Sequence, residues 1–167
     1  MSTIETLEQR GAEFSDCRRY RYVLWRRWNF QSYANQVMFI GLNPSTADEM
    51  EDDPTIRRCV GFAKDWGYGG ILMLNAYAFH STDPKGLKAV IDPVGPQNDE
   101  ALGYRRSQCG LVIAAWGSHC SPDREMQVCQ AIGKVIHCLG RTKSGKPKHP
   151  LYLKADTKPD VYWDPRP

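Results

Sequence analysis

Four nearly continuous apolar runs of strand length constrain the fold of this chain more than any other feature of its sequence. They cover residues 37–40, 71–74, 111–115 and 135–139, with helical or loop sequence between them. An apolar run without polar alternation is typical of a strand buried on both faces, as in parallel sheets covered by helices. The pattern predicts an α/β protein with three α/β/α layers around a central four-stranded, mainly parallel sheet.

The segments between the runs carry helix signals. Asp53 can cap a helix that begins at Pro54 and ends near Gly67, with its apolar residues on one face. Weaker helix signals follow Asp83 and Ser121 and cover residues 98–107, while residues 20–25 partly alternate, as an edge strand does. In the helix after Ser121 we expect Met126, Cys129 and Ile132 to face inward.

The length of 167 residues suits one domain. We expect a single α/β domain over residues 1–167, with an N-terminal helix and edge-strand extension (1–35), a core (36–153) and a C-terminal tail (154–167). The apolar runs are too short to span a bilayer, so we expect no membrane contact and a cytoplasmic protein. The six cysteines form no C-x-x-C pair, which argues for reduced, mostly core-packing thiols rather than a zinc or iron–sulfur site. No G-x-G-x-x-G follows the first run, so we expect neither a metal nor a cofactor. The oligomeric state stays open.

Polar residues of unusual type gather where the four apolar runs end. In an open parallel sheet, ligands bind outside the carboxyl ends of the strands, because the loops diverge there. The residues at these four ends are Gly41, Leu42, Asn43, Pro44, Ser45 and Thr46 after the first run, Asn75 after the second, Trp116 and Ser118 after the third, and His149 and Leu151 after the fourth. Their shared position predicts a candidate site.

Each of these residues also has a purely structural interpretation. The turn at Asn43 can bond its own backbone, Asn75 can satisfy a neighbouring loop, and His149 can be solvated in the basic loop that precedes it. The net charge of +3 permits contact with nucleic acid but does not require it. A functional site is therefore predicted from the four strand ends together, and from no single residue.

The ordered set Gly41-x-Asn43-Pro44, Asn75, Trp116-Gly117-Ser118 and His149-Pro150-Leu151 resembles the uracil-DNA glycosylase superfamily. More closely, Gly41-Leu42-Asn43-Pro44-Ser45-Thr46-Ala47-Asp48, Asp53-Pro54-Thr55-Ile56-Arg57-Arg58 and His149-Pro150-Leu151-Tyr152-Leu153 resemble a family of bacterial and phage proteins of unknown function. The glycosylase resemblance implies the fold of that superfamily and hydrolysis of an N-glycosidic bond to a base flipped out of the stack.

The same resemblance implies roles for single residues. Asn43 would position a water, His149 would donate a hydrogen bond to the departing base, and Asn75 would read the base edge. Ser45, Thr46 and the turn amides, together with Arg57 and Arg58, would position phosphate, and Leu151 would fill the vacated stack. An amide at position 43 can orient water but hardly deprotonate it, which implies a slow catalyst.

Two departures widen the choice of function. Leu151 and Tyr152 follow His149-Pro150 where the uracil enzymes typically have small, serine-containing residues, and no aromatic residue in 46–54 offers a stacking surface. Residues 48–53 form an acidic loop that would repel a duplex phosphate facing it. The hypotheses are therefore a metal-independent glycosylase acting on a damaged or modified base in nucleic acid, a non-catalytic module that binds nucleic acid or a nucleotide, and a hydrolase of a small nucleoside or nucleotide.

Overall fold

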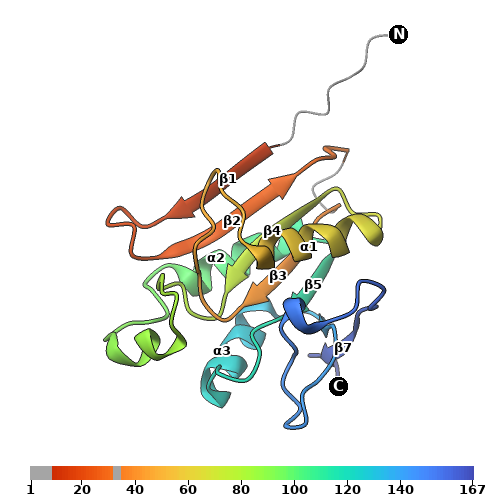
Figure 1. Cartoon of the computed structure of the whole chain (residues 1–167). Coiled ribbons are helices and arrows are strands. Elements are labelled where there is room, and N and C mark those ends of the chain that lie inside the picture. The colour runs from red at the N-terminus through yellow and green to blue at the C-terminus, as the bar shows by residue number, and fades with distance from the viewer. Residues whose placement is uncertain (1–8, 32–34) are drawn as a thin grey trace.

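The computed structural model describes residues 9–31 and 35–167, and in these residues seven strands form one mixed sheet (Figure 1). The sheet order is β1-β2-β4-β3-β5-β6-β7. The strands are β1 (Gln9–Phe14), β2 (Arg21–Arg27), β3 (Val37–Gly41), β4 (Gly70–Asn75), β5 (Leu111–Ala114), β6 (Ile136–Cys138) and β7 (Asp160–Trp163). Strand β7 lies in the segment that the sequence analysis treats as a C-terminal tail.

The prediction of a central four-stranded, mainly parallel sheet is wrong. Parallel pairings join β3 to β4, β3 to β5 and β5 to β6, but antiparallel pairings join β1 to β2, β2 to β4 and β6 to β7. Strand β2, expected at an edge, lies between β1 and β4. Its polar sequence is misleading because Arg21 and Arg26 are buried, with 2% and 0% of their surface exposed.

Helices pack on both faces of the sheet. Helix α1 (Pro54–Asp65) covers the face that carries Phe39 and Ile71, whereas α2 (Asn98–Arg105) and α3 (Pro122–Ile132) pack on the opposite face. The short 3-10 helices are η1 (Pro84–Ala89), η2 (Arg106–Gln108) and η3 (Pro150–Tyr152). Among the described residues, the structure has no helix with the length and apolar character needed to cross a bilayer.

Local sequence signals set the helix ends. Asp53 caps α1 as predicted, since its Oδ1 atom accepts a hydrogen bond from the Ile56 backbone N–H at 2.8 Å. Ser121 caps α3 in the same way. The expectation that Met126 faces inward is wrong, because Met126 is exposed and Val128 is buried instead. Five cysteines are buried and Cys17 is exposed, and all six are free thiols.

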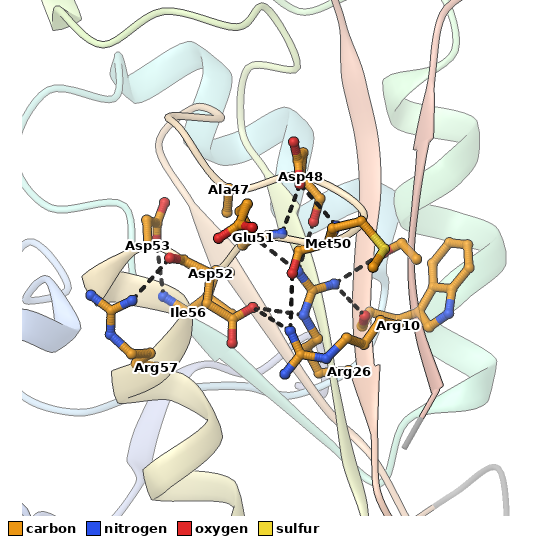
Figure 2. A network of polar contacts seen from close by, with 12 residues as sticks. Arg10, Arg26, Ala47, Asp48, Met50, Glu51, Asp52, Asp53, Ile56 and Arg57 are labelled. Carbon is orange, nitrogen blue, oxygen red and sulfur yellow. Dashed lines mark hydrogen bonds and ion pairs between the residues drawn. The ribbon is translucent and has the colours of Figure 1, made fainter. Parts of the chain in front are cut away.

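A buried arginine fastens the acidic loop, residues 48–53, to β2 (Figure 2). The Arg26 side chain donates from Nε to Asp52 Oδ1 at 2.7 Å and from Nη2 to the carbonyl oxygens of Asp48 and Glu51 at 2.7 and 3.3 Å. Its Nη1 atom donates to backbone carbonyls of β1 and β2. Because a buried guanidinium needs such partners, the loop must follow the position of Arg26, and α1 begins directly after it.

The carboxylates of this loop are engaged locally. Asp48 accepts from the backbone N–H groups of Met50 and Glu51, Glu49 forms an ion pair with Arg18 at 2.8 Å, and Asp53 caps α1. Asp52 is paired with Arg26. The expected repulsion of phosphate by this loop is therefore weakened in part, because arginines offset the charges of Glu49 and Asp52.

We predict that Arg26→Met lowers the free energy of unfolding by about 3 kcal/mol, because it leaves Asp52 and two loop carbonyls without their donor. Urea denaturation followed by circular dichroism measures the change. Arg57→Gln serves as a matched control, since Arg57 is exposed and makes a single hydrogen bond to the Asp52 carbonyl. Equal and small effects of the two substitutions would contradict the role given to Arg26.

Candidate functional site

A cavity of about 650 Å³ opens at the carboxyl ends of β3, β4 and β5, on the face of the sheet that α1 covers. This volume is within the range of sites that hold a small organic ligand. The first turn of α1, the loop after β4 and the segment from Lys148 to Tyr152 complete its wall. Nine of the predicted site residues line it, namely Gly41, Leu42, Asn43, Ser45, Asn75, Trp116, Ser118, His149 and Leu151.

Asn75 presents a buried amide with no internal partner. It is 1% exposed, and neither Nδ2 nor Oδ1 has a hydrogen-bond partner among the described residues. Leaving a buried polar group unsatisfied costs about 1–3 kcal/mol, so such a group in a cavity wall is suited to a ligand rather than to the fold. A side-chain amide offers one donor face and one acceptor face to that ligand.

Gly41 makes room for this amide. A Cβ atom at position 41 would lie 2.8 Å from Asn75 Oδ1 and 2.8 Å from the Met73 methyl carbon, closer than real Cβ contacts. Strands β3 and β4 pair in register here, with Gly41 opposite Asn75. The glycine is therefore explained by a close approach of the neighbouring side chain.

Asn43 is fixed in orientation by the backbone around it. Its Nδ2 atom donates to the carbonyl oxygens of Ser81 at 2.7 Å and Pro44 at 3.1 Å. Both amide hydrogens are therefore used, and Oδ1 is the atom that remains able to accept a hydrogen bond from a bound water or ligand.

His149 is held as a hydrogen-bond donor. Its Nδ1 atom accepts from the Leu151 backbone N–H at 3.3 Å, which places the proton of the neutral ring on Nε2. Burial lowers the pKa of His149 from its ordinary value, while the nearby Asp53 carboxylate acts in the opposite direction. The imidazole is therefore neutral at pH 7 and can donate through Nε2.

Arg21 and Asp53 also line the cavity, although their sequence context did not predict it. Asp53 was assigned only as a helix cap, but the cap uses Oδ1, and the Asp53 carboxylate is the acidic group among the described residues that line the cavity. Arg21 lies in residues 20–25, whose partly alternating pattern predicts an exposed edge strand. No pattern in the sequence marks either residue, because their position depends on how β2 and the acidic loop pack together.

The structure does not bring every predicted residue to the cavity. Arg57 donates to the Asp52 carbonyl, and Arg58 donates to the Leu153 carbonyl and lies over the Phe62 ring. Pro44 is buried, and Thr46 is exposed away from the lining. Neither arginine is therefore placed to position a phosphate in this cavity.

Trp116 and Leu151 border the cavity in different ways. The Trp116 indole N–H donates to Glu125 Oε1 at 3.0 Å and its ring packs edge-on against Tyr162, so its polar group is already used. Leu151 is 44% exposed, and Tyr152 beside it is 82% exposed. Tyr152 lines the cavity and offers an exposed aromatic ring, which residues 46–54 do not.

We predict that Asn75→Leu leaves the free energy of unfolding unchanged or raises it by about 1 kcal/mol, because it removes a buried amide that the free protein does not satisfy. Asn98→Leu is the matched control. Asn98 is 0% exposed and donates to the Asn75 and Ala76 carbonyls, so its loss should cost about 2 kcal/mol. Urea denaturation of both variants measures the difference. A large loss of stability in Asn75→Leu would show that the Asn75 amide is structural.

We predict that the His149 imidazole titrates below its ordinary pKa, and that Asp53→Asn lowers this pKa further by removing the carboxylate that favours the charged ring. Asparagine still caps the helix, which protects the fold. Because the unfolded chain binds this proton more readily, the stability contributed by neutral His149 is present above pH of about 6.5 and is lost as the pH falls below it. NMR titration of the ring signals measures both pKa values. An unchanged or higher His149 pKa in Asp53→Asn would contradict the assignment.

Among the residues in the ranges 9–31 and 35–167, no group of three or more histidine, cysteine, aspartate or glutamate side chains is arranged to hold a metal ion. Comparison with curated proteins and with solved structures gave no match. A family described as "Protein of unknown function (DUF1643)" matches residues 21–151, which include β2, the cavity-forming turns and His149. The chain therefore belongs to the DUF1643 family.

Proposed function

We propose that the cavity binds a nucleobase and that the protein hydrolyses the N-glycosidic bond of a damaged or modified base in nucleic acid. The observation that carries the proposal is the Asn75 amide, which is buried, lines the cavity and has no hydrogen-bond partner among the described residues. Its donor and acceptor match the adjacent carbonyl and N–H of an imide edge, such as that of uracil or xanthine.

Three further side chains support hydrolysis. Asn43 Oδ1 can accept a hydrogen bond from a water and orient it toward the anomeric carbon. As the bond from that carbon to the base nitrogen breaks, negative charge develops on the base, where the His149 Nε2–H can donate to an oxygen. Asp53 supplies a carboxylate that stabilises the positive, oxocarbenium-like sugar and can accept the proton that the water loses. The products are the free base and a sugar carrying a new hydroxyl at the anomeric carbon.

A second candidate is a non-catalytic module that binds a base or nucleotide in the same cavity. The hydrogen bonds that fix the Asn43 amide favour it, since an amide cannot remove the proton of a water and catalysis would depend on Asp53. The third candidate, a hydrolase of free nucleosides or nucleotides, uses the same residues on a smaller substrate. The three functions differ in product and in substrate size.

The assay uses uracil-, xanthine- and hydroxymethyluracil-containing oligonucleotides, single- and double-stranded, beside the corresponding free nucleosides and nucleotides. Mass spectrometry detects the released base, and alkali cleavage reports abasic sites. We expect release of at least one base, with a loss of about 100-fold in rate in Asn43→Ala and in Asp53→Asn. His80→Ala, an exposed histidine outside the cavity lining, is the control that should retain activity.

The outcomes separate the candidates. Base release only from free nucleosides or nucleotides selects the small-molecule hydrolase. Base-dependent binding without turnover, abolished by Asn75→Leu, selects the binding module. No release and no binding above the Asn43→Ala background with any substrate would contradict the proposal.

A further inference from the structure

Three arginines in the described part of the chain are almost fully buried. Arg21 is 2% exposed, Arg26 0% and Arg124 3%. A buried guanidinium is strongly destabilising unless hydrogen bonds and an opposite charge offset its desolvation. The three side chains therefore provide an internal comparison of how this protein satisfies a buried cation.

Two of the three are fully engaged. Arg26 donates to Asp52 and to several backbone carbonyls. Arg124 donates from Nε to the Ala76 carbonyl at 2.7 Å, from Nη1 to Gln127 Oε1, and from Nη2 to Asp99 Oδ1 at 2.6 Å. In each case every guanidinium nitrogen has a partner, and one partner is a carboxylate.

Arg21 differs from both. Its Nη1 atom donates to the Ala47 carbonyl at 2.8 Å, but its Nε is buried without a partner, and no hydrogen bond of Nη2 exists among the described residues. Asp53 is near enough to act on its charge, yet no carboxylate of the described residues lies within 4.0 Å of the guanidinium. Burial lowers the pKa of Arg21 to about 10, so the group remains a cation at neutral pH.

The unused atoms of Arg21 share one edge of the guanidinium plane. The Nε–H and one Nη2–H point in the same direction, a fork that matches two oxygens of a phosphate or carboxylate. Arg26 uses its own Nε for a carboxylate oxygen of Asp52. Arg21 lines the 650 Å³ cavity, whereas Arg26 and Arg124 do not. The only buried arginine of the three with free donors is thus the one that borders the cavity.

We propose that the Nε and Nη2 edge of Arg21 is a subsite for a phosphate group of the ligand, so that the cavity binds a phosphorylated nucleoside rather than a bare base. The proposal rests on the proposed function for the identity of the base, and among its candidates it favours the site for a small nucleotide over the site for a base within nucleic acid. Ser45, Thr55 and Lys148 also line the cavity and can donate to phosphate oxygens. The Asp53 carboxylate would repel a bound phosphate. This repulsion is reduced because Asp53 Oδ1 accepts a hydrogen bond at the N-terminal end of α1, which favours negative charge.

The depth of Arg21 favours a terminal phosphate over one within a strand. Because only 2% of the Arg21 side chain is exposed, only a small terminal group that enters the cavity can approach its free edge, whereas an internucleotide phosphate must bring the flanking nucleotides with it. The ligand class that fits best is therefore a nucleoside monophosphate. An internucleotide phosphate on the same edge is the other source of the same chemistry.

The first experiment uses the wild-type protein and inorganic phosphate. The Arg21 Nε–H signal in a ¹H–¹⁵N spectrum should shift on addition of phosphate and should not shift with chloride at equal ionic strength. The Arg26 and Arg124 Nε–H signals serve as internal controls and should stay in place. Absence of a phosphate-specific shift at Arg21 would overturn the proposal without any substitution being made.

The second experiment compares affinities by calorimetry for uridine and xanthosine, their 5′-monophosphates, and dinucleotides without a terminal phosphate. We expect the monophosphate to bind at least 10-fold more tightly than its nucleoside in the wild type, and about equally in Arg21→Met. Arg21→Lys, which keeps the charge but loses the fork, should give an intermediate ratio. Lys143→Gln, a change of an exposed cation outside the cavity lining, should leave the ratio unaltered.

Each result has a defined meaning. Preference for the monophosphate supports a terminal phosphate, and preference for the dinucleotide supports an internucleotide phosphate on Arg21. The subsite would be overturned if the ratio of monophosphate to nucleoside affinity were the same in Arg21→Met and in the wild type. It would also be overturned if Arg21→Met lowered the melting temperature as far as Arg26→Met does. A phosphate-dependent shift of the Arg21 Nε–H signal without any base release or nucleoside binding would contradict the proposed function but still support the phosphate subsite.

Discussion

The buried guanidinium of Arg26 is the interaction on which the arrangement of the site depends. It holds the backbone of the acidic loop against β2, and α1 begins where that loop ends. Asp53 consequently reaches the cavity while capping the helix, in a position where its charge acts on both Arg21 and His149. The carboxylate-rich loop thus has a structural role, because Arg18 pairs with Glu49, Arg26 pairs with Asp52, and Asp53 caps α1.

Polar groups of the interior that support the fold can be compared with those that border the cavity. Arg26, Arg124 and the donor atoms of Asn98 are satisfied by carbonyls and carboxylates, and they stabilise the fold. The Asn75 amide and one edge of Arg21 are buried without partners, and both border the same cavity. The Asn98 Oδ1, Arg58 Nε and His137 Nδ1 atoms are also buried without a partner, but these residues lie outside the cavity lining. Because Asn75 leaves both amide atoms unused and lines the cavity together with Arg21, we propose that a ligand completes their hydrogen bonds.

The sequence predicted the local features better than the sheet. The cap at Asp53 and the four buried strands followed from short-range rules, because helix ends and apolar runs are encoded in neighbouring residues. The mixed sheet was not predicted because the arginines of β2 are typical of an exposed edge strand. Their burial depends on carbonyl oxygens that are distant in the sequence. The position of Asn75 at the end of β4 could be predicted from the apolar run before it, whereas the burial of Arg21 beside the cavity could not.

The most direct test of this account is a crystal structure of the protein with a bound nucleoside 5′-monophosphate. The account predicts that the base edge lies within hydrogen-bond distance of both polar atoms of the Asn75 amide, and that the phosphate contacts the free edge of Arg21. A ligand bound elsewhere, or one in the cavity that leaves the Asn75 amide without a partner, would contradict it.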